Sequence, residues 1–361
     1  MAYMHASPGL FDDYLQPGRY CLAQSGLYLP YVQPAESDAV IVDCLNPSGT
    51  NIVTCKDPRI QLFLDEVGGL DFDIALSGGI KLNDPYIPIF DYRTIDFALV
   101  SDAEVVGLTL RDILVNPLKP VAGHYAFNKI KFRDVSVIRR LCSQKKVILF
   151  LTGLDVLIET IWHQRVPCEL FQQLNMMGFW AVSGFNFSVF GGECPVAQSL
   201  NQKKSLVSSM LVEENGMFTI PHIYAVNDFH IRKYQQWLKH NPQIQLVTMN
   251  CQMQRPEEDI EQVVRTVQAM LIVNSRLHII LQGYRFSEIH RLNGFLDRIH
   301  IAEAEPVKYA QNFQNSNREI PTLPGQYESG TYHSLVHSNI EYRSQKLHQL
   351  LNYMPTQTKG T

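Results

Sequence analysis

The stretch Phe179-Trp180-Ala181-Val182-Ser183 is an apolar run, and it leads into the more polar segment Gly184-Phe185-Asn186-Phe187-Ser188. A helix is expected over about 196–214, Gly216 ends it, and a second apolar run follows over 218–226. Strand, loop, helix, glycine and strand in this order make one βαβ unit. Such units build parallel sheets with helices packed outside.

The same alternation recurs along much of the chain. Helices are expected at 134–142, 154–163, 169–177, 229–240, 256–273 and 287–296, and a last one near 338–352. Parallel strands are expected at 74–77, at 97–100 or 105–110, and at 147–151, 179–183, 218–226, 245–249, 277–281 and 298–302. Pro88 marks the run 86–90 as an edge or irregular piece. Eight βα repeats favour a TIM-barrel-like (β/α)8 fold, with an open doubly wound parallel sheet as the alternative.

The composition is that of a folded chain with a large core. The 361 residues are 45% hydrophobic and 18% charged, and the net charge of −4 gives no strong nucleic-acid signature. We expect an N-terminal cover with a first strand at 39–44 (1–70), a barrel core (71–311) and a polar C-terminal extension with a terminal helix (312–361). In the core, Val147 to Leu151, Ile220, Val247, Ile279 and Ile280 should be almost fully buried in one sheet.

Cysteine spacing and the N-terminal sequence indicate the cellular compartment of the protein. The seven cysteines are scattered and never form CxxC, which favours reduced thiols over a disulfide frame or a structural zinc site. The N-terminal residues 1–5 show no cationic start followed by an apolar core, and no apolar run is long enough to span a membrane. These features predict a cytoplasmic protein without a membrane segment.

Polar side chains follow the predicted strands, at the end where barrels carry their active sites. A helix cap or loop role is the plainer interpretation of any one of them. As a set, they predict a site for a small polar ligand. The substrate-binding candidates are Asn186, Ser188, His222, Asn250, Gln252 and Gln282.

Two carboxylates are the candidates for acid–base catalysis. Glu303 follows the last strand and should point into or over the barrel mouth, and Asp155 follows the strand at 147–151. The alternative for Glu303 is an ion pair with a basic residue such as Arg285.

Other candidates have less support in the sequence. His222, His230 and His300 could form a metal site only if the fold gathered them, and no metal is predicted. The glycine turns at 78–79 and 191–193 could hold a phosphate on backbone amides, and Cys194 is the best thiol candidate. The pair Lys203-Lys204 is explained by a solvated outer face.

One resemblance covers about residues 148–284. The triplet Asn186-Phe187-Ser188 is followed by Pro195, Asn201, Ser205 and Gly216, and then by Ile220-Pro221. This resembles the hallmark of an uncharacterised domain family of bacteria, archaea and phages. That family has a strand ending in (D/N)-F-S, a proline, an asparagine ahead of an Arg-Ser helix, and a strand opening with Ile-Pro. Here Lys203-Lys204-Ser205 replaces the usual arginine. The resemblance implies a βα-repeat core and a phage or mobile-element setting, and it implies no reaction.

Two functions therefore remain open. The first is an enzyme acting on a nucleotide, nucleobase or similar polar metabolite, because Asn and Gln side chains offer both a donor and an acceptor to the edge of a base. The second is a non-catalytic scaffold in a larger assembly, with a protein partner at 312–361. The sequence assigns no cofactor.

Overall fold

The computed structural model describes residues 64–115, 118–121, 124–127, 131–189, 195–315 and 329–352. The expected strand at 39–44, the glycine turn at 191–193 and Cys194 lie outside these residues.

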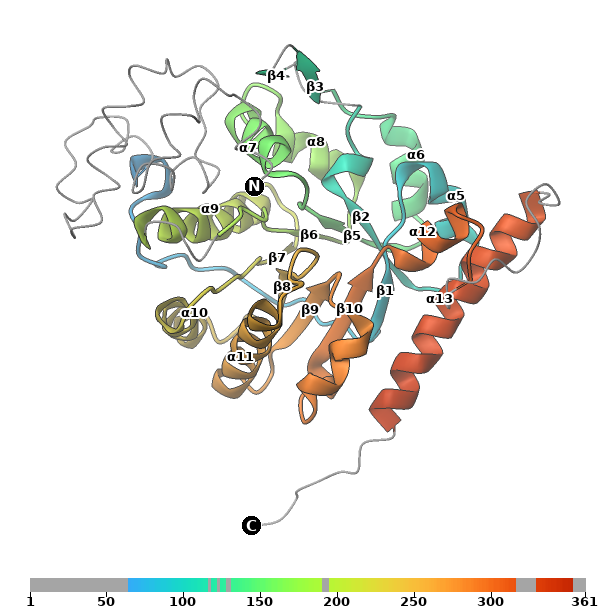
Figure 1. Cartoon of the computed structure of the whole chain (residues 1–361). Coiled ribbons are helices and arrows are strands. Elements are labelled where there is room, and N and C mark those ends of the chain that lie inside the picture. The colour runs from blue at the N-terminus through green and yellow to red at the C-terminus, as the bar shows by residue number, and fades with distance from the viewer. Residues whose placement is uncertain are drawn as a thin grey trace.

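Eight parallel strands of the described residues close into a barrel (Figure 1). Two four-stranded sheets, β1-β10-β9-β8 and β2-β5-β6-β7, are joined by parallel bridges between Ile89 and Gly107 and between His222 and Thr248. The predicted (β/α)8 architecture is confirmed, and the open sheet is excluded. The strands are β1 (Tyr86–Pro88), β2 (Val105–Thr109), β5 (Lys146–Phe150), β6 (Ala181–Ser183), β7 (Thr219–Ile220), β8 (Leu246–Asn250), β9 (His278–Gln282) and β10 (Ile299–Glu303).

Helices surround the barrel, and a hairpin of β3 (Leu118–Val121) and β4 (His124–Phe127) lies apart from it (Figure 1). The helices are α5 (Ile95–Val100), α6 (Val135–Cys142), α7 (Asp155–Gln164), α8 (Leu170–Met177), α9 (Pro195–Glu214), α10 (Asp228–His240), α11 (Glu257–Val273), α12 (Glu305–Gln311) and α13 (Ser329–Asn352), with 3-10 turns η4 (Tyr92–Thr94) and η5 (Leu110–Asp112). The helix expected at 287–296 is instead two 3-10 turns, η6 (Phe286–Leu292) and η7 (Leu296–Arg298), separated by Gly294 at φ +89°. No described helix has the length and apolar character that a membrane span needs.

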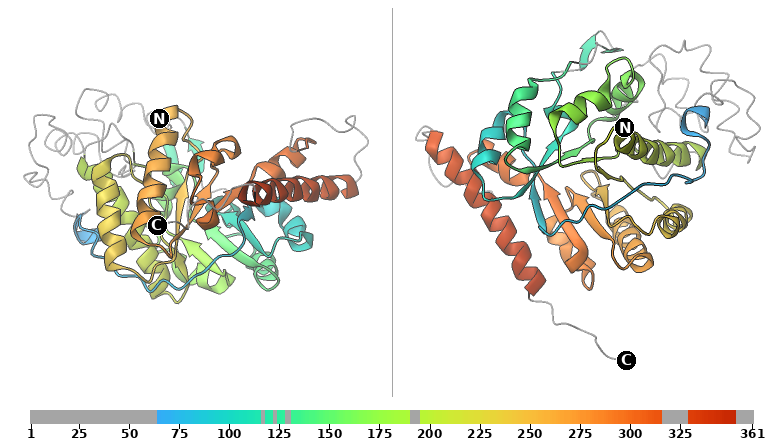
Figure 2. Two further views of the ribbon diagram at one scale, coloured as in Figure 1. Left: turned by 90° about the horizontal axis from the view of Figure 1, so that it is seen from below. Right: turned by 180° about the vertical axis from the view of Figure 1, so that it is seen from behind.

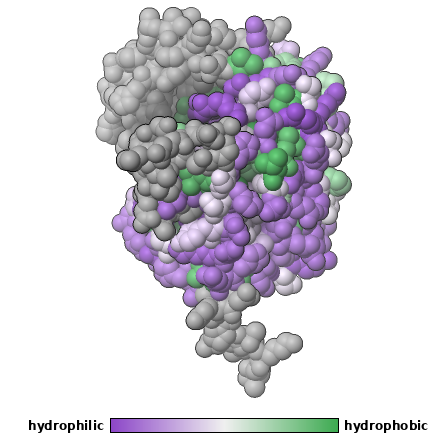
Figure 3. Space-filling model, turned by 90° about the vertical axis from the view of Figure 1, so that its right-hand side faces the viewer, coloured by the Kyte–Doolittle hydropathy of each residue, from purple (hydrophilic) through white to green (hydrophobic). Residues whose placement is uncertain are grey.

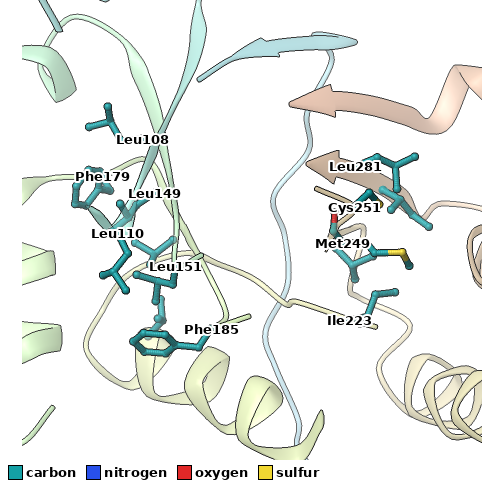
Figure 4. Close-up of a cluster of buried hydrophobic side chains, with 14 of the residues drawn as sticks. Leu108, Leu110, Leu149, Leu151, Phe179, Phe185, Ile223, Met249, Cys251 and Leu281 are labelled. Carbon is teal, nitrogen blue, oxygen red and sulfur yellow. Dashed lines mark hydrogen bonds between the residues drawn. The ribbon is translucent and has the colours of Figure 1, made fainter. Parts of the chain in front are cut away.

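The strands bury side chains on both faces. One face fills the barrel lumen, with residues such as Ile148, Phe150 and Ile280, and the other packs against the helices. Figure 4 shows part of the second layer, including Leu149 and Met249. The predicted core is confirmed, since every residue of 147–151 and Ile220, Val247, Ile279 and Ile280 has no exposed surface.

The prediction of a barrel strand at 74–77 is wrong. Ile74 and Leu76 are buried, but their backbone groups bind side chains of α10 and the loop after it instead of a neighbouring strand. Trp237 Nε1 donates to Ile74 O at 2.8 Å, and Leu76 N donates to Asn241 Oδ1 at 3.2 Å. Residues 70–82, which we call the strap, thus run along the helices and on to β1, as Figure 2 shows in the right-hand view.

The true first strand lies in the run that contains Pro88. Ile89 N donates to Glu303 O at 2.8 Å on the β10 side, and pairing with β2 starts beyond Pro88, where Phe90 N donates to Gly107 O at 2.9 Å. Because proline has no backbone N–H, Pro88 cannot donate a hydrogen bond, but no hydrogen bond between strands is lost at this position. Of the two predicted alternatives for the second strand, 105–110 is right, while 97–100 lies in α5, which buries Ile95 and Ala98 at helical spacing.

Helix α13 packs back on the barrel. It buries Leu335, Val336, Ile340 and Leu347, and Asn339 Nδ2 donates to Pro306 O at 3.2 Å. On this side of the molecule the surface is mostly hydrophilic (Figure 3).

Candidate functional site

The polar candidates that follow β5 to β9 lie at one end of the barrel, because parallel strands present their carboxyl ends together. Asn250 pairs in register with Gln282 of the next strand. Asn186 N donates to Leu151 O at 3.1 Å, just beyond the ends of β5 and β6. Asn186 and Asn250 are therefore at the same end, as the sequence predicts.

Asp155 and Ser188 are in direct contact. The Ser188 hydroxyl donates a hydrogen bond to Asp155 Oδ1. Asp155 is the first residue of α7, where the positive end of the helix dipole favours a carboxylate. Asn201 Nδ2 donates to Ser188 O at 2.7 Å, so the residue that orients Asp155 is itself held by α9.

The surroundings of Asp155 shift its proton affinity. Burial raises the pKa of the Asp155 carboxyl above its usual value, while the Ser188 hydroxyl and the Lys204 charge act in the opposite direction. The result is a carboxyl group at a strand end whose pKa lies nearer to neutrality than that of an exposed aspartate.

Lys204 joins this cluster, which the sequence did not predict. Both Lys203 and Lys204 are buried, at 1% and 3% exposure, so the expected solvated face is wrong. Lys204 Nζ lies 4.0 Å from the centre of the Phe187 ring, and the Phe187 ring packs edge-on against Trp162 with 5.4 Å between centres. Lys203 Nζ instead donates to the Asp73 carboxylate and to Asp71 O of the strap. Aromatic contact with Lys204 and the ion pair of Lys203 offset part of the cost of burying two ammonium groups.

His222 and Asn250 are connected through the backbone. Asn250 N donates to His222 Nε2 at 3.2 Å, so the other ring nitrogen, Nδ1, carries the proton. Burial lowers the pKa of His222 to about 3, so the ring is neutral. The Asn250 Oδ1 accepts from Gln252 N at 3.1 Å, and Gln252 is exposed. His222 thus positions the end of β8, and Gln252 stands free of the core.

Gln282 closes the lumen under this end of the barrel. Its Nε2 donates to Thr152 Oγ1 at 3.0 Å, although β9 and the end of β5 lie on opposite sides of the ring. Gln282 has no exposed surface, and within the described part of the chain its Oε1 has no hydrogen-bond partner. An unsatisfied buried acceptor is costly, which marks this oxygen as a place for a donor group.

Glu303 does not point into the mouth. On β10, Ala302 faces the lumen while Ile301 faces the helices, and Glu303 shares the side of Ile301. Its Oε1 accepts from the Tyr86 hydroxyl at 3.1 Å and lies 3.6 Å from Arg343 Nε. The orientation predicted for Glu303 is therefore wrong, and its ionic partner is Arg343 of α13 instead of Arg285.

The histidines considered as metal ligands are not gathered. His300 Nδ1 contacts Asp84 O at 2.7 Å and its Nε2 contacts His278 Nδ1 at 3.0 Å, at the N-terminal end of the barrel, whereas His222 lies just after β7 and His230 on α10. Among the described residues, no three or more His, Cys, Asp or Glu side chains form a group that could hold a metal ion.

A small cavity also lies away from the polar cluster. Thr219 and Leu246, the first residues of β7 and β8, line it together with Gly78 and Ile80 of the strap. It has room for about one water molecule, too little for a substrate.

Comparison with known proteins adds a distant likeness in fold. No family model and no curated protein matches the chain. Among solved structures, the chain is similar to the YdjI aldolase from Escherichia coli K12, with 8% sequence identity and a TM-score of 0.42 over 73% of this chain and 89% of that one. The strand pairing, and not this likeness, is what assigns the chain to the parallel (β/α)8 barrels.

Proposed function

We propose that this barrel protein is an enzyme that acts on a small polar metabolite, a nucleobase or nucleotide being the favoured class, with Asp155 as its acid–base residue. The observation that carries the proposal is the Asp155–Ser188 pair at the carboxyl end of the strands, where barrels perform their chemistry.

The chemistry follows from the surroundings of Asp155. A carboxyl group whose pKa is raised by burial exchanges a proton near neutral pH more readily than an exposed one. Ser188 restricts the direction of the carboxyl group, and the buried Lys204 ammonium favours its ionised form. Together these groups support proton transfer to or from a bound molecule.

The amide groups at the same end support the choice of substrate. Asn186, Asn250 and Gln252 present donors and acceptors at the barrel rim. Beneath them, the Gln282 Oε1 is an acceptor that has no hydrogen-bond partner among the described residues. A heteroaromatic base carries both kinds of group along one edge, so amides complement it. Glu303 takes no part in this proposal, because it faces the helices.

The experiment begins with binding. Free bases, nucleosides and nucleoside monophosphates are screened by thermal shift, because a ligand that binds the folded state raises the melting temperature. Turnover of each hit is then followed for the native protein, for Asp155→Asn and for Asp297→Asn. Asp297 is an exposed aspartate near the opposite end of the barrel and serves as the matched control.

Asp155→Asn is expected to bind the hit and lose about 100-fold or more of the turnover, since general acid–base catalysis contributes at least that much. Asp297→Asn should turn over like the native protein. Equal turnover in a folded Asp155→Asn variant would remove Asp155 from the mechanism, and the absence of any hit would remove the substrate class.

A second candidate is the non-catalytic scaffold in a phage or mobile-element assembly. Large apolar side chains stand exposed beside the ends of β5, β7 and β8, namely Leu154 at 70%, Phe229 at 52% and Met253 at 81%. Exposed apolar groups at one rim suit a protein partner. If the scaffold is right, Met253→Asp abolishes association of a partner copurified with the native protein, and Asp155→Asn leaves that association intact.

A further inference from the structure

The contact between α13 and the barrel contains a buried ionisable pair. Arg343 points inward from α13, and its side chain is 10% exposed. Its Nη2 lies 3.0 Å from Glu305 Oε2 at the start of α12, and its guanidinium carbon lies 5.0 Å from the centre of the Phe286 ring. The Arg343 Nε reaches Glu303 at 3.6 Å, which is an ionic contact too long for a hydrogen bond.

Glu303 is enclosed by elements on every side. The charged and titratable groups that face it are Tyr86 from β1, Glu305 from α12 and Arg343 from α13. Glu303 is 3% exposed, and within the described residues the Arg343 Nε makes no hydrogen bond. A carboxylate here is separated from water, and Arg343, the cation that contacts it, is shared with Glu305.

Burial decides the proton affinity of this group. It raises the pKa of Glu303 to about 7, although Arg343 pulls in the opposite direction, and the negative charge of Glu305 adds to the rise. If α13 moves away, Glu303 meets water and its pKa returns toward the ordinary value of about 4.3.

We propose that Glu303 makes the docking of α13 on the barrel pH-dependent, with α13 held most tightly when Glu303 carries a proton. The docked state binds this proton more strongly than the undocked state, so acid favours docking. The stabilisation is fully present below the ordinary glutamate pKa and is lost as the pH rises through about 7. This direction is opposite to that of a simple salt bridge, which would weaken in acid.

The size of the effect follows from the two pKa values. With Glu303 titrating near 7 when docked and near 4.3 when undocked, the docking equilibrium constant should fall about tenfold between pH 6 and pH 8. At pH 8, α13 would therefore undock from the barrel measurably more often than at pH 6.

Hydrogen–deuterium exchange of α13 in the full chain tests this at pH 6 and pH 8, after correction for the intrinsic exchange rate and with α11 as the internal reference. The native protein should show about tenfold more frequent opening of α13 at pH 8. Glu303→Gln, which mimics the protonated acid, should keep α13 protected at both pH values. Glu261→Gln, an exposed glutamate on α11, should behave like the native protein.

Two outcomes overturn the proposal. One is α13 opening in the native protein that does not change with pH relative to α11, a measurement that needs no variant. The other is a folded Glu303→Gln protein that keeps the native pH dependence.

Discussion

Gly107 lies at the seam where β1 and β2 close the barrel. A Cβ atom at this position would lie 2.9 Å from Ile89 Cγ1 and 2.9 Å from Phe150 Cε2, closer than carbon atoms approach without strain. Phe150 is fully buried and Ile89 nearly so. Neither side chain has free space to move into, so one added methyl group must displace the packing of the lumen.

Gly107→Ala is therefore expected to lower the free energy of unfolding by about 1–3 kcal/mol, the usual cost of overpacking a core. The backbone offsets part of this loss. Gly107 does not have a positive φ, and at such a position in a strand alanine is more favourable than glycine. Gly153→Ala is the matched control. It too lacks a positive φ, and its nearest contact is the flexible end of Leu157 at 3.2 Å, so stability should change by less than about 0.5 kcal/mol.

Urea unfolding followed by tryptophan fluorescence measures both variants, with three tryptophans as probes. A double-mutant cycle with Phe150→Leu identifies the cause, since removing the ring should make Gly107→Ala less costly and give a coupling energy above about 0.5 kcal/mol. A Gly107→Ala protein as stable as the native one would refute the described packing at the seam.

Further measurements test the core, the strap and the buried histidine. Leu149→Ala should cost about 2–5 kcal/mol in urea unfolding through a cavity between β5 and the helices, and a loss below about 1 kcal/mol would contradict its full burial. Lys203→Met removes the donor to Asp73 and to the strap backbone. The backbone amides of 70–77 should then exchange hydrogen for deuterium faster, and the free energy of unfolding should fall by about 1 kcal/mol. Unchanged exchange of these amides would show that Lys203 does not hold the strap. Because burial lowers the pKa of His222 to about 3, His222 stabilises the fold above its ordinary pKa and this contribution is lost as pH falls below about 6.5. In the His222→Gln variant, about one proton fewer should be taken up on unfolding between pH 6.5 and 4.5, so the free energy of unfolding should fall less steeply with acid. The same pH slope of this free energy in the variant and the native protein would show that His222 does not cause the acid sensitivity.

The sequence predicted the strands that are buried on both faces, because only such strands are continuous apolar runs of a few residues. The run 147–151 is of this kind. The run 74–77 is also largely apolar, but Ile74 and Leu76 bond to side chains of Trp237 and Asn241, more than 160 residues away, and no local pattern records these partners. Apolar composition identifies burial, and distant side chains decide whether the buried segment is a strand.

The site was less predictable, for two physical reasons. Glu303 is the last residue of β10 and not the first residue after it, and in a strand a difference of one position turns a side chain to the other face. Lys203 and Lys204 are both buried, because α9 lies between the strap on one side and Phe187 on the other. Helical periodicity could not show this, since two adjacent lysines normally indicate a solvated surface. Asp155 and Ser188 both follow strands, as the sequence predicts, but their contact depends on the tertiary fold.

The strap also determines the order in which parts of the chain can fold. Its backbone groups bind side chains 132 to 167 positions further along, and Tyr86 pairs with Ile301, near the other end of the barrel sequence. During synthesis the strap and β1 leave the ribosome long before these partners exist. Contacts between segments so distant are slow to form, and exposed strand edges attract other chains in the meantime. We expect β2, β5, β6 and β7 to assemble first and β1 to insert last, so a nascent chain stopped before β10 should be prone to aggregation and to proteolysis ahead of β2.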